Sequence, residues 1–364
     1  METTVAEMEA CRSREFGREV KALVAEHFAR TGVSPHANAA MIAKSVIVAA
    51  AYFGAYLALL TGHFSWPVAW LLCVVMGFGL AGLGFSVAHD ALHGAYSANP
   101  RVNGLLGLAF EALGGNGHAW SVTHNGAHHT FPNVSGYDGD VDITPLLRLS
   151  PHTPHRPVHR FQHLFALGLY GLATLNWALL KDYAYFLRMG SRPRGARAPT
   201  TGAWARLLVG KLVFYGAMAL PFLVVEGPAW RILIGLLTVH LTAGTIVGVV
   251  FQLAHAVEGA EHGDPSGATR AKDGWAAHQL RSTSNFARGN ALLGWYVGGL
   301  NYQVEHHLFP RVCHVHYAAI SRIVEAAALR HGLPYNSIPT FGAALSSHYR
   351  TLRALGRPPV EAAV

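Results

Sequence analysis

The sequence predicts an all-α integral membrane protein in which four transmembrane helices form two hairpins beneath a cytosolic helical cap. Hydrophobic residues make up 51% of the 364-residue chain and charged residues only 13%, and the mean hydropathy is +0.25. Four apolar runs approach the roughly 20 residues that a helix needs to cross a bilayer, where the backbone must satisfy its own hydrogen bonds. Histidines gather in three clusters outside these runs. This composition excludes an ordinary soluble domain.

The first expected element is an amphipathic helix within a cytosolic N-terminal region, residues 1–40. Residues 12–31 place five apolar side chains near one face at helical spacing. They are Phe16, Val20, Leu23, Val24 and Phe28. We expect this helix to dock against the rest of the protein without chemistry of its own. Glu2, Glu7 and Glu9 precede any apolar run, so no cleavable signal peptide is predicted.

The membrane domain is predicted to follow over residues 41–364 with four spans. These run over residues 46–60, 68–88, 207–225 and 232–250. The short connections TGHFSWP and EGPAW join the first span to the second and the third to the fourth, which favours two tight hairpins. Tryptophans occur near the span ends, where indole rings prefer the headgroup layer. They are Trp66, Trp70, Trp204 and Trp230.

A fifth apolar run, Leu164–Leu180, is predicted to lie in the membrane interface or to be re-entrant. If it crossed, the first two histidine clusters would lie on the opposite side of the membrane from the third. With four crossings, all three clusters face the same side. The alternative is a true span in a protein whose histidines share no site.

Basic residues orient the protein. The connection between the second and third spans is rich in Lys and Arg, whereas the hairpin loops carry only Arg231, at a span edge. The positive-inside rule therefore places both termini and a cap built from residues 89–203 and 251–364 in the cytosol. In a bacterium the membrane would be the inner membrane. The net charge of +8 fits attraction to anionic headgroups, and no motif indicates nucleic-acid binding. The basic residues of the connection are Arg148, Arg156, Arg160, Lys181, Arg188, Arg192, Arg194 and Arg197.

The three histidine clusters are HDALH, HNGAHH and QVEHH. Such clusters can arise by chance, because in a chain of 364 residues with 23 histidines any chosen spacing of two histidines is expected to occur about 1.5 times. A chosen three-histidine spacing falls to roughly 0.1, so HNGAHH is unusual. The position of all three clusters outside the apolar runs strengthens the pattern. Their histidines are His89, His93, His124, His128, His129, His306 and His307.

Helical geometry allows these imidazoles to share metal ions. His89 and His93 follow the second span without a Gly or Pro break, so both lie on one helical face. His255 lies past the fourth span in the same way. In HNGAHH, His124 and His128 should share a face while the next histidine points about 100° away. Eight imidazoles are too many for one tetrahedral or octahedral ion, so a di-metal site is predicted.

Spacing alone leaves the metal open among zinc, copper, iron and nickel, which imidazole binds. A structural zinc site usually contains cysteine, and the Glu-x-x-His pairs of soluble di-iron bundles are missing. Gln303 is a possible ligand at the start of the third cluster. Five nearby carboxylates are expected to orient imidazoles, to bind Arg or to remain solvated, and three of them, Asp90, Asp140 and Glu305, are possible ligands. The five are Asp90, Asp138, Asp140, Asp142 and Glu305.

The segments HDALHG, HNGAHHTFPN and GGLNYQVEHHLFP resemble the three histidine boxes of the integral-membrane fatty acid desaturases. The likeness extends from about Phe85 to Tyr317 and includes the glutamine that opens the third box in front-end and related acyl desaturases. The stretch before that box looks like bacterial acyl-CoA or linoleoyl-CoA-type members. The resemblance implies a non-haem di-iron centre on the cytosolic side. It also implies O₂-dependent removal of two hydrogens from neighbouring methylenes of an acyl chain carried by CoA or a lipid.

The resemblance further implies that the seven box histidines and His255 are iron ligands. Gln303 stands where some relatives have His, so its coordination stays open. Other histidines are expected to form hydrogen bonds or face headgroups: His118, His262, His278, His314 and His316. No haem-binding HPGG segment occurs, so electrons should come from a separate ferredoxin or cytochrome-type carrier with its reductase. We expect that carrier to dock on a face containing Arg281, Arg288 and Arg311.

Two other functions remain open at this point. A lipid hydroxylase or ketolase could use the same scaffold. A histidine-rich metal transporter would place its ligands near the bilayer midplane, whereas these clusters lie beyond the span ends. Two runs of small residues, Gly77–Phe85 and Thr242–Gly248, could either line an acyl channel or permit close helix packing.

Overall fold

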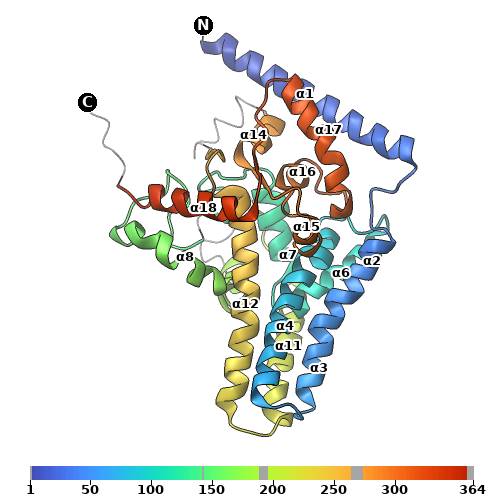
Figure 1. The fold of residues 1–364 in the computed structure, drawn as a ribbon, viewed down its shortest axis with the longest axis vertical. Coiled ribbons are helices and arrows are strands. Elements are labelled where there is room, and N and C mark those ends of the chain that lie inside the picture. Colours follow the sequence, from blue (N-terminus) through green and yellow to red (C-terminus); the bar gives the residue numbers. More distant parts are fainter. Residues whose placement is uncertain (1, 142, 188–195, 264–273, 359–364) are drawn as a thin grey trace.

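Four long helices form the core of the molecule. The structure is a computed structural model that describes residues 2–141, 143–187, 196–263 and 274–358. In Figure 1 the long helices run side by side toward one narrow end, and shorter helices gather at the opposite, wide end. All four are long and apolar enough to cross a membrane. The four predicted apolar helices are thus confirmed as helices of spanning length.

Each long helix is longer than its predicted range of 46–60, 68–88, 207–225 or 232–250, and the extra residues lie chiefly at the end that meets the wide part of the molecule. There Lys44, Asp90 and His255 find hydrogen-bond partners, so these turns do not depend on an apolar environment. The first consists of α2 (Ala39–Ala49), the π-helix η1 (Ala50–Gly54) and α3 (Ala55–Leu60). The second consists of α4 (Trp66–Leu83), the π-helix η2 (Gly84–Ala88) and α5 (His89–Leu92). The third and fourth are α11 (Thr201–Val224) and α12 (Ala229–His255).

Glycines let these helices approach one another closely. A Cβ atom at Gly77 of α4 would lie 2.6 Å from Thr242 Cβ of α12, and one at Gly79 would lie 2.7 Å from the Tyr52 nitrogen. Gly248 of α12 is similarly packed against Tyr170. At these positions the two glycine-rich runs serve helix packing.

The fifth apolar run forms two helical pieces bent by 60°. Lys211 of α11 donates a hydrogen bond to Asp182 of the second piece at 2.8 Å, which ties this segment to the bundle. Leu164, Leu167 and Leu180 leave their side chains exposed. The run is therefore not one straight spanning helix. Its elements are η4 (Pro157–Phe161), α8 (Gln162–Gly171), α9 (Ala173–Asn176), η5 (Trp177–Lys181) and α10 (Asp182–Phe186).

The wide end, which we call the cap, is made of the long N-terminal helix α1 and of shorter helices from both halves of the chain (Figure 1). The prediction of an all-α chain needs one correction, because β1 (Asn285–Phe286) and β2 (Ser337–Ile338) form a parallel pair. The cap helices are α1 (Glu2–Thr31), α6 (Pro100–Ala112), α7 (Gly117–Trp120), η3 (Ser121–His128), α14 (Trp275–Ser282), α15 (Ala291–Tyr296), α16 (Gln303–Leu308), η6 (His314–His316), α17 (Tyr317–Arg330) and α18 (Phe341–Leu355).

The N-terminal helix α1 is longer than predicted and starts at Glu2. Its apolar face is buried at Phe16, Val20 and Val24. Phe16 and Val20 pack with residues of α14 and α17, and Val24 packs with residues of α17, the two helices with which α1 makes its main contacts. The predicted amphipathic helix is therefore present, and it closes the cap from outside.

Candidate metal centre

The ends of two long helices and two cap helices bring the eight predicted histidines into one cluster. α5 begins at His89, and His93 ends it. α12 ends at His255. The second histidine cluster of the sequence lies on η3 and at its C-cap, and the third lies on α16. The ends of two long helices and two short cap helices thus position the ligand candidates.

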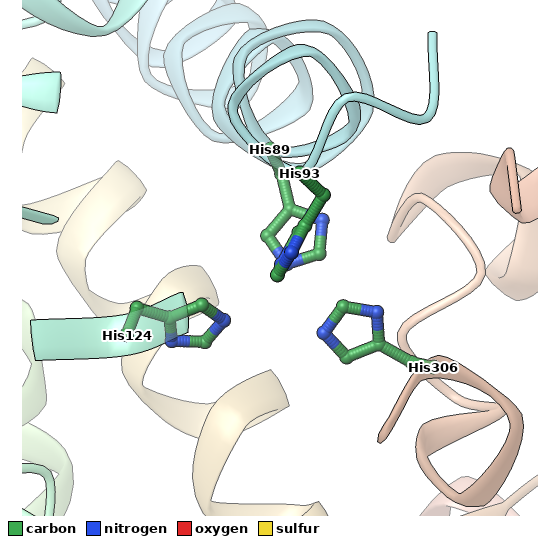
Figure 2. A group of neighbouring side chains, drawn as sticks. All are labelled: His89, His93, His124 and His306. Carbon is green, nitrogen blue, oxygen red and sulfur yellow. The ribbon is translucent and has the colours of Figure 1, made fainter. Parts of the chain in front are cut away.

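The imidazoles form two neighbouring groups. In the first, one ring nitrogen from each of four histidines lies within 4.8 Å of the others, and Figure 2 shows the rings surrounding a common point. Three histidines meet the same criterion in the second group. The first group is His89, His93, His124 and His306, and the second is His128, His255 and His307.

A π-helix distributes the second cluster between these groups. We expected an α-helical period here, but residues Ser121–His128 are wound with hydrogen bonds that join residues five apart. The His129 N–H accordingly donates to the His124 carbonyl oxygen at 3.0 Å. His129 Nε2 then lies 3.2 Å from His124 Nε2, and its ring stacks on His307 with centroids 4.4 Å apart. His129 therefore stands between the two groups.

In seven of the eight histidines of this cluster, one buried ring nitrogen has no hydrogen-bond partner in the described part of the chain. Buried polar atoms are rarely left unpaired, so convergent lone pairs indicate bound cations. The all-imidazole donor set suits iron, zinc, copper or nickel. The unpaired atoms are Nδ1 of His89 and His129 and Nε2 of His93, His128, His255, His306 and His307.

Neighbouring groups hold the other ring nitrogen of several candidates. Nδ1 of His128 donates to Asp138 at 2.9 Å, and Nδ1 of His307 donates to the Gln279 side-chain oxygen at 2.8 Å. His255 Nδ1 lies 3.3 Å from the Ser282 carbonyl oxygen. Such contacts fix the tautomer and leave the Nε2 lone pair free for a metal.

Burial keeps most of these imidazoles neutral, which is the form that binds metals. Burial lowers the pKa of His124 to about 3, although Asp140 opposes this shift. Burial and neighbouring histidines lower the pKa of His306 well below its usual range. At His128 burial also disfavours the charge, but Asp138 outweighs it and raises the pKa. A metal ion would displace a proton from that ring.

The predicted carboxylates take different positions. Asp90 accepts a hydrogen bond from His314 Nδ1 at 2.8 Å, and its other oxygen lies 3.8 Å from His89 Nδ1. Asp140 accepts a hydrogen bond from Lys181 at 2.9 Å and lies 3.9 Å from His124 Nδ1.

Glu305 is turned away from the imidazoles, since Asn285 and Tyr335 donate to it at 2.9 and 2.7 Å. Burial raises its pKa to about 7. Gln303 is buried and lines the same cavity as His306. Asp142 lies outside the described residues.

The five histidines that were expected to lie outside the site join neither group. Nε2 of His278 and of His316 contacts a carbonyl oxygen, at 2.9 and 3.0 Å. The His118 ring packs against aromatic rings, and burial lowers the pKa of His262 to about 4. His314 lies near Asp90 and Cys313, yet its Nε2 is 2.8 Å from the Lys44 amine, which occupies the space a cation would need.

A cavity of about 1060 Å³ opens onto the first group. His89, His124 and His306 line it together with Gln303, whereas no member of the second group does. The remaining wall is mainly apolar and comes largely from the bent segment, residues 136–140 and 143–147, the second long helix and α12. Its side chains include Phe85, Leu169, Tyr170, Leu180, Val247 and Phe251.

Sequence reasoning missed several residues that contact the candidates. Gln279 and Ser282 come from α14, and Tyr317 begins α17 with its hydroxyl 3.1 Å from His306 Nδ1. Trp120 stacks on His124 with ring centroids 4.3 Å apart. No spacing rule marks these residues, because they reach the histidines through tertiary packing.

The expected arginine-rich face is partly neutralised. Arg288 donates to both carboxylate oxygens of Glu325, at 2.9 and 3.1 Å. Arg281 lies 3.9 Å from Glu261. These two side chains are therefore not free cations, and an electrostatic docking surface built on them is weaker than the sequence indicated.

Four helices of spanning length with a buried polyhistidine cluster at one end define a class of protein, the helical membrane proteins that carry a metal-binding histidine site. Comparison with known proteins narrows that class. Residues 64–339 match the family model described as fatty acid desaturase. The chain therefore belongs to the fatty acid desaturase family, and it is a desaturase.

The chain is similar in sequence to individual relatives over nearly its whole length. It is 35% identical to an sn-1 linoleoyl-lipid 6-desaturase of Synechocystis, with 97% of this chain and 99% of that protein covered. The corresponding enzyme of Arthrospira platensis is 32% identical, over 100% of this chain and 99% of the relative. An acyl-lipid (8-3)-desaturase of Physcomitrium patens is 31% identical, with 94% of this chain and 72% of that protein covered.

Proposed function

We propose that this desaturase introduces a double bond into an acyl chain carried by a membrane lipid, at a di-iron centre held by the eight histidines. One observation carries the proposal: an apolar cavity large enough for a lipid chain ends at three histidines of the first group. The relatives named above act on acyl or linoleoyl lipids, which favours a lipid-linked substrate over acyl-CoA.

The first group would hold one iron and the second group the other, with His129 between them. Iron bound there would supply the oxidation of two neighbouring C–H bonds by O₂. The net reaction balances when the two substrate hydrogens, two electrons and two protons reduce O₂ to two waters. Asp90 and Asp140 are proposed to orient imidazoles rather than to bind iron. Glu305 is proposed to act in the same way from a greater distance.

The protein's own task is to position an acyl chain that offers no polar handle. Apolar walls around Phe251 and Leu180 bind methylenes by excluding water. Trp120 packs over His124 and limits the movement of that ring. A methylene pair held beside the first group reacts in preference to its neighbours because proximity and orientation set the rate.

We further propose that four helices cross the membrane as two hairpins and that the cap and both termini are cytosolic. The bent segment would lie in the interface on the cap side. In a bacterium this is the inner membrane. Single cysteines at Arg330 and Gly227, in a chain whose own cysteines are replaced, test this. Reagent added outside should label position 227 only; external labelling of position 330 contradicts the orientation.

Electrons are proposed to come from a separate ferredoxin or cytochrome-type carrier with its reductase. Purified protein given NAD(P)H and O₂ alone should be inactive, and addition of reductase and carrier should restore turnover. Activity without any carrier would contradict this supply route.

The central experiment is lipid analysis of a host that expresses the chain. Acyl chains lacking two hydrogens relative to the control are expected, and purified protein should contain about two iron ions per chain. Acyl chains that gain an oxygen instead would identify a hydroxylase. A single stoichiometric zinc with full activity would overturn the di-iron proposal.

A further inference from the structure

One strip of the second long helix faces the cavity. Between residues 79 and 93 every residue is buried except Gly84, His89 and Leu92. These three all line the cavity. The strip therefore leads from the membrane part of the helix, past a ligand candidate of the first group, toward the cap.

Gly84 lies one π-helical turn before His89. The His89 N–H donates to the Gly84 carbonyl oxygen, as expected for hydrogen bonds that join residues five apart. Residues on successive turns occupy the same side of a helix. A side chain at position 84 would therefore point along the same wall of the cavity as the His89 ring.

Neither backbone geometry nor packing explains a glycine at this position. Its φ of −55° and ψ of −57° are ordinary helical values that any residue adopts. A Cβ atom at Gly84 would meet nothing within 4 Å, whereas one at Gly77, Gly79 or Gly82 of the same helix would meet neighbouring atoms at 2.6 to 3.0 Å. Glycine in a helix interior costs roughly 0.5–1 kcal/mol relative to alanine. The space in front of Gly84 belongs to the cavity.

We propose that Gly84 determines substrate specificity: its missing side chain keeps the cavity open on the membrane side of His89, so that a long acyl chain can extend past the metal centre. The size of residue 84 then limits how much chain fits there. The inference rests on the proposed desaturation of acyl chains and adds a residue that selects chain length.

The test is the series Gly84→Ala, Gly84→Val and Gly84→Leu in a host fed fatty acids that differ only in their number of methylenes. Conversion of the longest chain should fall in the order of side-chain size, by about tenfold or more for leucine. Conversion of the shortest accepted chain should fall least. Gly216→Leu is the matched control, because Gly216 also has open space around it but lies on the exposed face of α11 and does not line the cavity.

Two measurements separate a narrowed cavity from a damaged protein. Iron content should stay the same across the series. Binding of a conjugated polyene fatty acid, which fluoresces in apolar surroundings, should weaken for Gly84→Leu and not for Gly216→Leu. Equal losses for all chain lengths, or unchanged conversion in every variant, overturn the inference. If the unmodified chain desaturates nothing, the proposed function fails instead, and probe binding still decides the role of Gly84.

Discussion

The two histidine groups differ in what surrounds them. Three members of the first group, His89, His124 and His306, line the cavity, whereas the second group is enclosed by protein. In the second group each Nδ1 has a partner, from Asp138, Gln279 or the Ser282 carbonyl, and all three Nε2 atoms are unpaired. In the proposed di-iron centre this difference would divide two tasks: the first metal position would face the substrate, and the second would be held behind it.

The largest expected effect comes from removing a ligand candidate. His306→Ala and His128→Ala should each lower activity by more than about a hundredfold, since loss of an outer partner alone costs about 10–100-fold in metal affinity or activity. His128→Ala should lose more iron, because its group keeps only two imidazoles while the first keeps three. Lipid analysis and metal content measure both effects. Full iron content in His128→Ala would contradict the proposal that the second histidine group holds its own iron ion.

Asp138→Asn tests the rigid anchoring of the second group. The carboxylate accepts from His128 Nδ1 at 2.9 Å and from the Asn133 N–H at 3.0 Å. An amide of the same shape removes the charge that favours this arrangement, and we expect iron affinity to fall about 10–100-fold. Glu261→Gln is the control, because its carboxylate is exposed. Iron retained during dialysis against a chelator is the readout, and equal retention in both variants contradicts the anchoring role.

Chelation should also separate the two groups in the unmodified protein. A chelator that enters the cavity reaches the first group directly, whereas the second group requires local opening of the cap. Iron should therefore leave in a fast and a slow phase of similar amplitude, and Gly84→Leu should slow the first phase only. Release of all iron in a single phase would show that both groups are equally accessible.

The smallest effect is expected at Tyr317→Phe. The Tyr317 hydroxyl lies 3.1 Å from His306 Nδ1, and the phenylalanine ring would keep the packing. A net hydrogen bond contributes about 1 kcal/mol, so iron affinity of the first group should fall about fivefold. Iron titration of the metal-free protein tests this. A loss as large as that of Asp138→Asn would mean that the first group is as tightly anchored as the second.

The sequence predicted the four long helices and the convergence of eight histidines, because hydropathy and histidine clustering are local signals. It missed Gln279, Ser282 and Tyr317, whose roles arise only when α14 and α17 fold onto the cluster. It also could not decide which glycines pack and which leave space. Gly79 and Gly84 look alike in the sequence, yet only the structure shows that one contacts Tyr52 and the other borders the cavity.

The π-helical winding of η3 limits which insertions and deletions the site can accept. Deletion of one residue there, such as Thr123, would favour ordinary α-helical winding, with hydrogen bonds that join residues four apart. In ordinary α-helical winding, residues five apart differ by about 140° about the helix axis, so His129 would no longer lie one turn after His124, between the two histidine groups. Evolution can therefore exchange many side chains in this stretch more easily than it can insert or delete a single position.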